Sequence, residues 1–187
     1  MSIPNLITFI RILLIPVFVL VFYLPFHGSH ITTALIFALA ALTDWLDGYL
    51  ARSLGQVSKL GAFLDPVADK LMVAVALVLI VGENDWPYLA IPAAVVVGRE
   101  IVISALRAWM AEVGKRASVA VSFLGKVKTT VQMLALILLL AYKPGANIWI
   151  GIAGYVLLYV AAVLTLISMI IYLKAAWMDL TREGNFT

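Results

Sequence analysis

Four of the six aspartates in this 187-residue chain lie within residues 44–69, and they come as two pairs. Asp44 and Asp47 form the first pair, and Asp65 and Asp69 form the second. Long apolar runs precede and follow this stretch. A carboxylate at the centre of a membrane-spanning helix costs roughly 2.5–3.5 kcal/mol on insertion scales, so acids in such a setting usually mark a functional site.

The spacing of these residues predicts that the acids converge. Residues four apart share one face of a helix, as Asp65 and Asp69 do in the second segment. Asp44, Gly48 and Arg52 repeat the four-residue step in the first segment. Two neighbouring helices would therefore present four carboxylates toward each other, which suits a pair of hard divalent cations.

The acids predict metal-assisted chemistry at a phosphorus atom. Unpaired, four such carboxylates would repel one another and take up protons, and bound cations relieve the repulsion. All-oxygen ligation indicates Mg²⁺ or Mn²⁺ rather than zinc, because the chain has no cysteine and its two histidines lie elsewhere. Two such ions about 3.5–4 Å apart stabilise the attacking and leaving oxygens of an in-line displacement together.

Three further residues narrow the substrate to a nucleotide or another phosphate compound. The guanidinium fork of Arg52 suits a phosphate group, and Gly48 and Gly61 leave room for a base or a pyrophosphate beside the helices. One alternative is an ion network that only joins helices. Another is a cation transporter, although Arg52 would repel its cargo and the chain shows no internal repeat.

Composition indicates the elements that must position these residues. Hydrophobic residues make up 64% of the chain and charged residues 12%, against about 45–50% and about 25% in soluble domains. At roughly 20 residues per crossing, the length allows about six spans and no separate soluble domain. The predicted fold is an all-α integral membrane protein with six transmembrane helices and a short N-terminal amphipathic helix.

The apolar runs predict one membrane domain over residues 1–187, and they define where each helix lies. The spans are expected at about 12–24, 31–50, 61–81, 88–110, 121–142 and 148–174, after an amphipathic segment at 1–11. In that segment, apolar residues recur at helical spacing opposite Asn5, Thr8 and Arg11. Such a pattern is typical of a helix that lies on a membrane surface.

Charge placement predicts the orientation. Six spans put both termini and the aspartates on one side, and that side holds twelve of the thirteen lysines and arginines, with Lys143 opposite. The positive-inside rule assigns this side to the cytoplasm. The active site is therefore expected at the cytoplasmic face.

These residues also resemble a known family. The pattern Asp44-x2-Asp47-Gly48-x2-Ala51-Arg52-x8-Gly61-x3-Asp65-x3-Asp69 matches, without departure, the signature of the CDP-alcohol phosphatidyltransferases. It specifies eight positions across 26 residues. Three outer motifs resemble bacterial members more loosely: Pro4-Asn5-Leu6-x-Thr8-x2-Arg11, Arg99-Glu100, and Gly125-Lys126-x-Lys128-Thr129 with Gln132.

The resemblance implies a role for each residue of the motif. The two metal ions would be held by Asp44, Asp47, Asp65 and Asp69. The binding site for the cytidine diphosphate head of CDP-diacylglycerol would be lined by Gly48, Ala51, Arg52 and Gly61. Asp69 would also be the general base, removing a proton from the acceptor hydroxyl, which attacks the β-phosphorus and releases CMP. The resemblance also implies a bacterial inner membrane location and a homodimer.

The motif leaves the acceptor alcohol open, because the family uses several. The chain carries surplus cations on the same side, and we expect Arg107, Lys126 and Lys128 to bind an acceptor phosphate. A dianionic acceptor such as sn-glycerol 3-phosphate is favoured, with inositol phosphate and phosphatidylglycerol as alternatives. One of the adjacent residues Arg99 and Glu100 is expected to form an ion pair or hydrogen bond with another helix, and a structural role is favoured over substrate contact.

Overall fold

The computed structural model describes residues 3–54, 59–84, 86–112, 123–145 and 147–181, and this part of the chain is helical with short connections and no strand. The backbone alone is described at 3–7, 44–54, 59–60, 62, 123–124, 126, 175–176 and 178–181. The helices are α1 (Ile3–Tyr23), α2 (Ser29–Leu54), α3 (Lys59–Glu83), α4 (Ala90–Glu112), α5 (Phe123–Ala141) and α6 (Ile148–Thr181).

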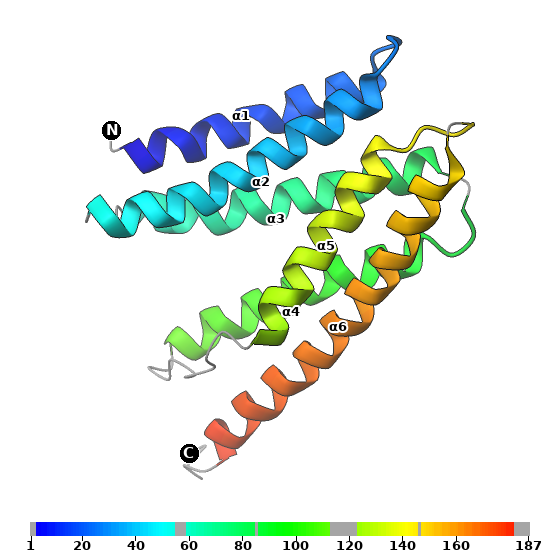
Figure 1. The fold of residues 1–187 in the computed structure, drawn as a ribbon. Coiled ribbons are helices and arrows are strands. Elements are labelled where there is room, and N and C mark those ends of the chain that lie inside the picture. Colours follow the sequence, from blue (N-terminus) through cyan, green and yellow to red (C-terminus); the bar gives the residue numbers. More distant parts are fainter. Residues whose placement is uncertain (1–2, 55–58, 85, 113–122, 146, 182–187) are drawn as a thin grey trace.

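Successive helices run in alternating directions along the bundle (Figure 1). Helix α1 contacts α2 and α3, while α6 contacts α4 and α5. Contacts of α2 with α5, and of α3 with α4 and α5, join these two groups. The two chain ends marked in Figure 1 lie at the same end of the bundle, as six alternating helices require.

The N-terminal segment is not a separate amphipathic helix. Residues 3–23 form the single continuous helix α1, so the expected boundary at residue 11 is wrong. The polar residues of the segment explain the difference, because Thr8 is fully buried and Arg11 is 2% exposed. Their partners lie inside the bundle rather than at a water-exposed surface, and no turn residue interrupts the helix between them and the apolar run.

One helix corresponds to each expected span, with ends that differ by a few residues. Helix α2 continues to Leu54 and α3 begins at Lys59, so both extend beyond their expected limits at 50 and 61. Helix α6 also continues past residue 174 to Thr181. Polar residues at these ends remain helical, and the aspartate motif consequently lies within the last turns of α2 and the first turns of α3.

The apolar core joins all six helices at the level away from the aspartates. Phe18 of α1 and Phe37 of α2 are fully buried, with ring centroids 6.1 Å apart. Leu77 of α3, Val96 of α4 and Leu136 of α5 are buried beside them in the same cluster. Burial of each such side chain stabilises the bundle by about 1.5–3 kcal/mol.

Helices α5 and α6 approach closely at a glycine. A Cβ atom at Gly154 would lie 2.8 Å from Leu139 Cγ and 3.1 Å from the backbone nitrogen of Leu139. Only a residue without a side chain allows this approach. The contact aligns α6 along α5, and it thereby determines which residues of α6 reach the interior further along the helix.

The helices differ in the length of their apolar segments. Within the described residues, Ile148–Lys174 is the one helical segment long and apolar enough to cross a membrane by length and composition, with a mean hydropathy of 2.6. Three shorter apolar stretches lie at Thr8–Tyr23, Ser29–Thr43 and Val127–Ala141.

Candidate active site

Helix α1 contacts the second aspartate pair directly. The Thr8 hydroxyl donates a hydrogen bond to Asp65 Oδ1, and Arg11 Nη1 donates to Asp69 Oδ1 at 2.9 Å. Thr8 and Arg11 are one turn apart on α1, as Asp65 and Asp69 are on α3. The two helices therefore meet along matched polar faces, with a cation of α1 against a carboxylate of α3.

The Arg11–Asp69 pair is buried on one side only. The Arg11 side chain is 2% exposed, whereas the Asp69 side chain is 39% exposed. The guanidinium thus compensates the carboxylate from within the bundle and leaves Asp69 accessible from outside. A carboxylate held in this way can bind a cation or accept a proton from a hydroxyl group.

The first aspartate pair lies on α2. Asp44, Asp47, Gly48, Ala51 and Arg52 all belong to the continuous helix, and only residues 55–58 separate its end from α3. Their side chains lie outside the described part of the structure. The convergence of four carboxylates, and the roles of Gly48, Ala51 and Arg52, therefore remain predictions. Gly61 is buried in the first turn of α3.

The described side chains provide half of the predicted metal site. Among them no group of three or more acidic, histidine or cysteine residues lies close enough together to hold a metal ion. Asp65 and Asp69 are one turn apart and both are partly exposed, so their oxygens suit a hard cation such as Mg²⁺ or Mn²⁺. The donor chemistry present at α3 fits the predicted ions.

A cavity of about 320 Å³ connects Asp69 with the cations of α4 and α5. All six helices contribute to its wall, and the polar and charged residues that line it are Arg11, Asp69, Lys70, Arg99, Glu100, Arg107, Lys128, Thr129, Gln132, Ser168 and Tyr172. The predicted general base and two of the three predicted phosphate-binding residues thus face one space. Its cationic wall favours an anionic ligand.

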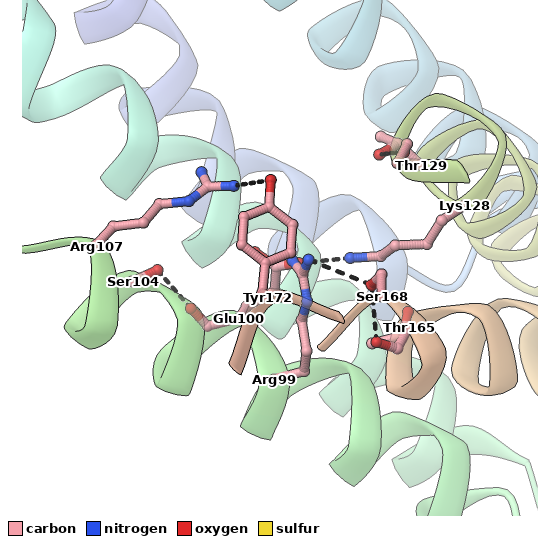
Figure 2. A network of polar contacts seen from close by, with 10 residues as sticks. Arg99, Glu100, Ser104, Arg107, Lys128, Thr129, Thr165, Ser168 and Tyr172 are labelled. Atoms are coloured by element: carbon pink, nitrogen blue, oxygen red, sulfur yellow. Dashed lines mark hydrogen bonds and ion pairs between the residues drawn. The ribbon is translucent and has the colours of Figure 1, made fainter. Parts of the chain in front are cut away.

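Glu100 organises the cations of this wall (Figure 2). Its Oε1 atom accepts hydrogen bonds from Arg99 Nη1 and from Lys128 Nζ, each at 2.9 Å. Lys128 is 4% exposed, so the shared carboxylate compensates a charge that water barely reaches. Together with Arg107, three cations face one carboxylate, and the excess positive charge is available to a ligand.

Helix α6 holds the arginines from the other side (Figure 2). Arg107 Nη2 donates to the Tyr172 hydroxyl at 3.1 Å, and its Cζ lies 5.2 Å from the centroid of the Tyr172 ring. Arg99 Cζ lies 5.9 Å from the same ring, and Arg99 Nη2 donates to Ser168 Oγ at 3.4 Å. One aromatic ring therefore stabilises two guanidinium groups by cation–π contact.

The structure partly matches the sequence-based site. Arg107 and Lys128 line the cavity, while the side chain of Lys126 lies outside the described part. The expected interhelical ion pair is confirmed between Glu100 and Lys128. However, Arg99 and Glu100 also face the cavity, although a structural role was favoured over substrate contact.

Sequence reasoning missed the contribution of α6 and only partly anticipated that of α1. Arg11 was expected at the membrane interface, with the mouth of the site as an alternative, and it is buried against Asp69. A basic residue one turn after a threonine on an otherwise apolar helix is a signal that could have indicated a carboxylate partner. Tyr172 and Ser168 carry no such signal, because tyrosine and serine are common near the ends of apolar helices.

Comparison with known proteins defines the class. Residues 1–167 match the CDP-alcohol phosphatidyltransferase family, and the chain belongs to this family. It is 56% identical over 186 residues to a protein of Pseudomonas fluorescens, covering 99% of this chain and 95% of the relative. That relative is named CDP-diacylglycerol–glycerol-3-phosphate 3-phosphatidyltransferase.

Enterobacterial relatives carry the same name. Proteins of Salmonella typhimurium (strain LT2) and Escherichia coli (strain K12) are each 58% identical to the chain over 179 residues. In both cases the match covers 96% of this chain and 97% of the relative. The similarity therefore includes the helices that carry the cationic wall as well as the aspartate motif.

The shared carboxylate predicts a stability effect. Glu100→Gln removes the charge with little change in shape and leaves Lys128 buried without its counter-charge. Because one partner of a buried pair is lost, we expect the free energy of unfolding to fall by about 3–5 kcal/mol. Thermal unfolding of the detergent-purified protein measures this change.

A second substitution separates charge from packing. In the double variant Glu100→Gln, Lys128→Met the unpaired ammonium group is gone, so most of the lost stability should return. If the double variant is less stable than Glu100→Gln alone, the ion pair is not the source of the effect.

Proposed function

We propose that this protein transfers the phosphatidyl group of CDP-diacylglycerol to sn-glycerol 3-phosphate, giving phosphatidylglycerophosphate and CMP. One observation carries the proposal: the cavity that contains Asp69 of the family motif is also lined by Arg99, Arg107 and Lys128. A phosphate-bearing acceptor needs such cations beside the general base. The names of the bacterial relatives specify the same donor and acceptor.

The six helices span the bacterial inner membrane in this proposal. Large apolar side chains face outward on several helices, with Leu13 of α1 67% exposed, Val78 of α3 70% and Ile101 of α4 64%. Such a surface is unfavourable in water and suits lipid. Because both termini lie with the basic residues at one end of the bundle, that end faces the cytoplasm.

The aspartates hold two divalent cations, Mg²⁺ or Mn²⁺, in this proposal. Asp65 and Asp69 supply oxygens from α3, and Asp44 and Asp47 supply them from α2. When bound, the ions neutralise the pyrophosphate charge of the donor and stabilise the leaving phosphate oxygen. Thr8 restrains one of the α3 carboxylates through its hydrogen bond to Asp65.

The donor binds at the junction of α2 and α3. Gly48 and Gly61 leave space beside the two helices, Ala51 is small enough to do the same, and Arg52 pairs with a phosphate of the cytidine diphosphate head. Since α2 and α3 are joined by a short connection at the cytoplasmic end, the head group can bind there while the acyl chains stay in lipid. The family resemblance supports these assignments.

The acceptor phosphate binds at the wall formed by α4 and α5. Arg107 and Lys128 pair with its oxygens, together with Lys126. Tyr172 fixes the Arg107 guanidinium by a hydrogen bond and by contact with its ring, so the arginine is oriented before the ligand arrives. Glu100 limits the positive charge that a ligand must neutralise.

The transfer step uses Asp69 as the general base. Its carboxylate takes the proton of the acceptor hydroxyl as the oxygen of that hydroxyl forms a bond to the β-phosphorus. The bond from that phosphorus to the bridging oxygen breaks, and CMP leaves with the electron pair. Arg11 donates to Asp69 Oδ1 at 2.9 Å and holds the carboxylate in place. A homodimer, implied by family membership, is part of the proposal.

The direct test is an acceptor panel. Purified protein is incubated with CDP-diacylglycerol, Mg²⁺ or Mn²⁺, and glycerol 3-phosphate, inositol phosphate, serine or phosphatidylglycerol, and CMP release is measured. Release with glycerol 3-phosphate alone is the expected result. Equal or faster release with another acceptor would reassign the acceptor, and no release with any acceptor from folded protein would exclude the enzyme.

The general base predicts a specific loss. Asp69→Asn cannot accept the proton, so we expect turnover to fall by at least about 10³-fold, whereas binding of CDP-diacylglycerol should weaken far less. Turnover is measured as CMP release, and donor binding by equilibrium titration. Glu83→Gln, at the other end of α3, is the control and should keep normal turnover. Near-normal activity of Asp69→Asn would contradict the assignment.

The proposed phosphate-binding role of Lys128 predicts that its substitution raises the KM for the acceptor and not that for the donor. A hydrogen bond to a charged group contributes about 1.5–3 kcal/mol, so Lys128→Met should raise the KM for glycerol 3-phosphate by at least about tenfold. The KM for CDP-diacylglycerol should change by less than about twofold. Lys143→Met, in the connection between α5 and α6, is the control. Equal changes in both KM values would argue against a phosphate-binding role.

A further inference from the structure

In the cavity wall, Gln132 Oε1 on α5 and Arg99 Nε on α4 are buried polar atoms without a hydrogen-bond partner within the described part of the chain. Gln132 is 5% exposed and the Arg99 side chain is 10% exposed. A buried polar group without a partner costs about 1–3 kcal/mol. Because both residues line the cavity, a ligand there can supply what each atom lacks.

Contacts on α4 and α5 bring the two residues to the same part of the wall. Lys128 and Arg99 donate to one oxygen of Glu100, each at 2.9 Å. Gln132 follows Lys128 by one helical turn and therefore lies on the same face of α5. Each terminal nitrogen of Arg99 already has a partner, Glu100 or Ser168, whereas Nε has none in the described part of the chain.

The two atoms complement each other chemically. Arg99 Nε carries a hydrogen and needs an acceptor, whereas Gln132 Oε1 needs a donor. An alcohol hydroxyl provides both at once, and it also pairs with either end of the glutamine amide. A fully ionised phosphate oxygen accepts but cannot donate, so it could pair only with the Nε2 end of the amide and would leave Gln132 Oε1 unpaired. The two atoms therefore fit the alcohol part of a ligand rather than its phosphate.

We propose that Gln132, with Arg99 Nε, forms a subsite for the secondary hydroxyl of the acceptor. This inference rests on the proposed function. Glycerol 3-phosphate carries a phosphate at one end, a terminal hydroxyl at the other and a secondary hydroxyl between them. With the phosphate at Arg107 and Lys128 and the terminal hydroxyl at Asp69, the central hydroxyl binds at Gln132. Gln132 thus determines specificity and takes no part in the chemical step.

An analogue without that hydroxyl tests the subsite. The compound 3-hydroxypropyl phosphate keeps the phosphate and the terminal hydroxyl of glycerol 3-phosphate. A site built to bind a hydroxyl discriminates strongly against an analogue that lacks it, and we expect the wild-type kcat/KM to be at least about 100-fold lower for the analogue. CMP release with each acceptor, at saturating CDP-diacylglycerol, gives both values.

Gln132→Met should remove the discrimination. Methionine is unbranched and of similar size, but it offers only a weak acceptor. We expect kcat/KM for glycerol 3-phosphate to fall by about 30-fold and that for 3-hydroxypropyl phosphate to change by less than about threefold. Both acceptors are measured on one preparation, so their ratio does not depend on the fraction of protein that is folded.

Asn84→Leu is the matched control. Asn84 follows α3 at the opposite end of the bundle, is 7% exposed and has an amide oxygen, Oδ1, without a partner in the described part of the chain. It does not line the cavity. Its substitution removes an equally buried amide and should leave the ratio between the two acceptors at its wild-type value.

The outcomes separate the subsite from the proposed function. If the wild type uses glycerol 3-phosphate but accepts the analogue equally well, or if Gln132→Met keeps the wild-type ratio, the subsite is wrong and the function stands. If Gln132→Met is inactive, Gln132→Asn is measured in its place, because its side chain is one methylene shorter and moves the amide away from the ligand. A wild-type ratio of the two kcat/KM values in Gln132→Asn also overturns the subsite. A wild type that releases no CMP with either acceptor removes the function and the subsite together.

Discussion

A charge placed between apolar helices must meet an opposite charge, and this requirement determines how the bundle is assembled at its polar end. Arg11 is almost completely buried, and it is compensated by Asp69 from a helix more than fifty residues further along the chain. Lys128 is compensated in the same way by Glu100. Leaving either cation unpaired would cost several kcal/mol. The two ion pairs therefore join α1 to α3 and link α4 to α5 through their side chains at the level of the site.

Each ion pair belongs to a different part of the proposed site, and the two parts lie on two groups of helices. Helices α1 to α3 carry the aspartates and the residues that restrain them, and they form the side proposed for the metal ions and the donor. Helices α4 to α6 carry the cations proposed for the acceptor phosphate. The cavity lies where the groups meet, so a hydroxyl bound by one group can reach a carboxylate of the other. Closely packed apolar residues further along the bundle keep this alignment rigid.

Much of the candidate site could be predicted because it depends on the spacing of residues along single helices. Asp65 and Asp69 share a face through a four-residue step, and that relation holds wherever the helix packs. The cationic nature of Arg107 and Lys128, and their end of the bundle, follow from composition and span count. Arg11 shows where this reasoning fails, because its partner lies on another helix and its burial depends on how the two helices pack. Tyr172 was missed for the same reason.

The sequence by itself determined the all-helical architecture and the family, and it supplied the residues proposed to bind metal and phosphate, because helical periodicity and apolar composition act over short distances. Tertiary structure decided which polar residues meet. The single helix over residues 3–23 formed because Thr8 and Arg11 have partners on α3, which no local pattern in the segment specifies. Likewise, Gln132 follows the basic motif of α5, and only packing of all six helices makes it part of the same cavity wall as Arg99. Long-range contacts are set by shape and charge across the whole bundle, so they become visible only in the folded chain.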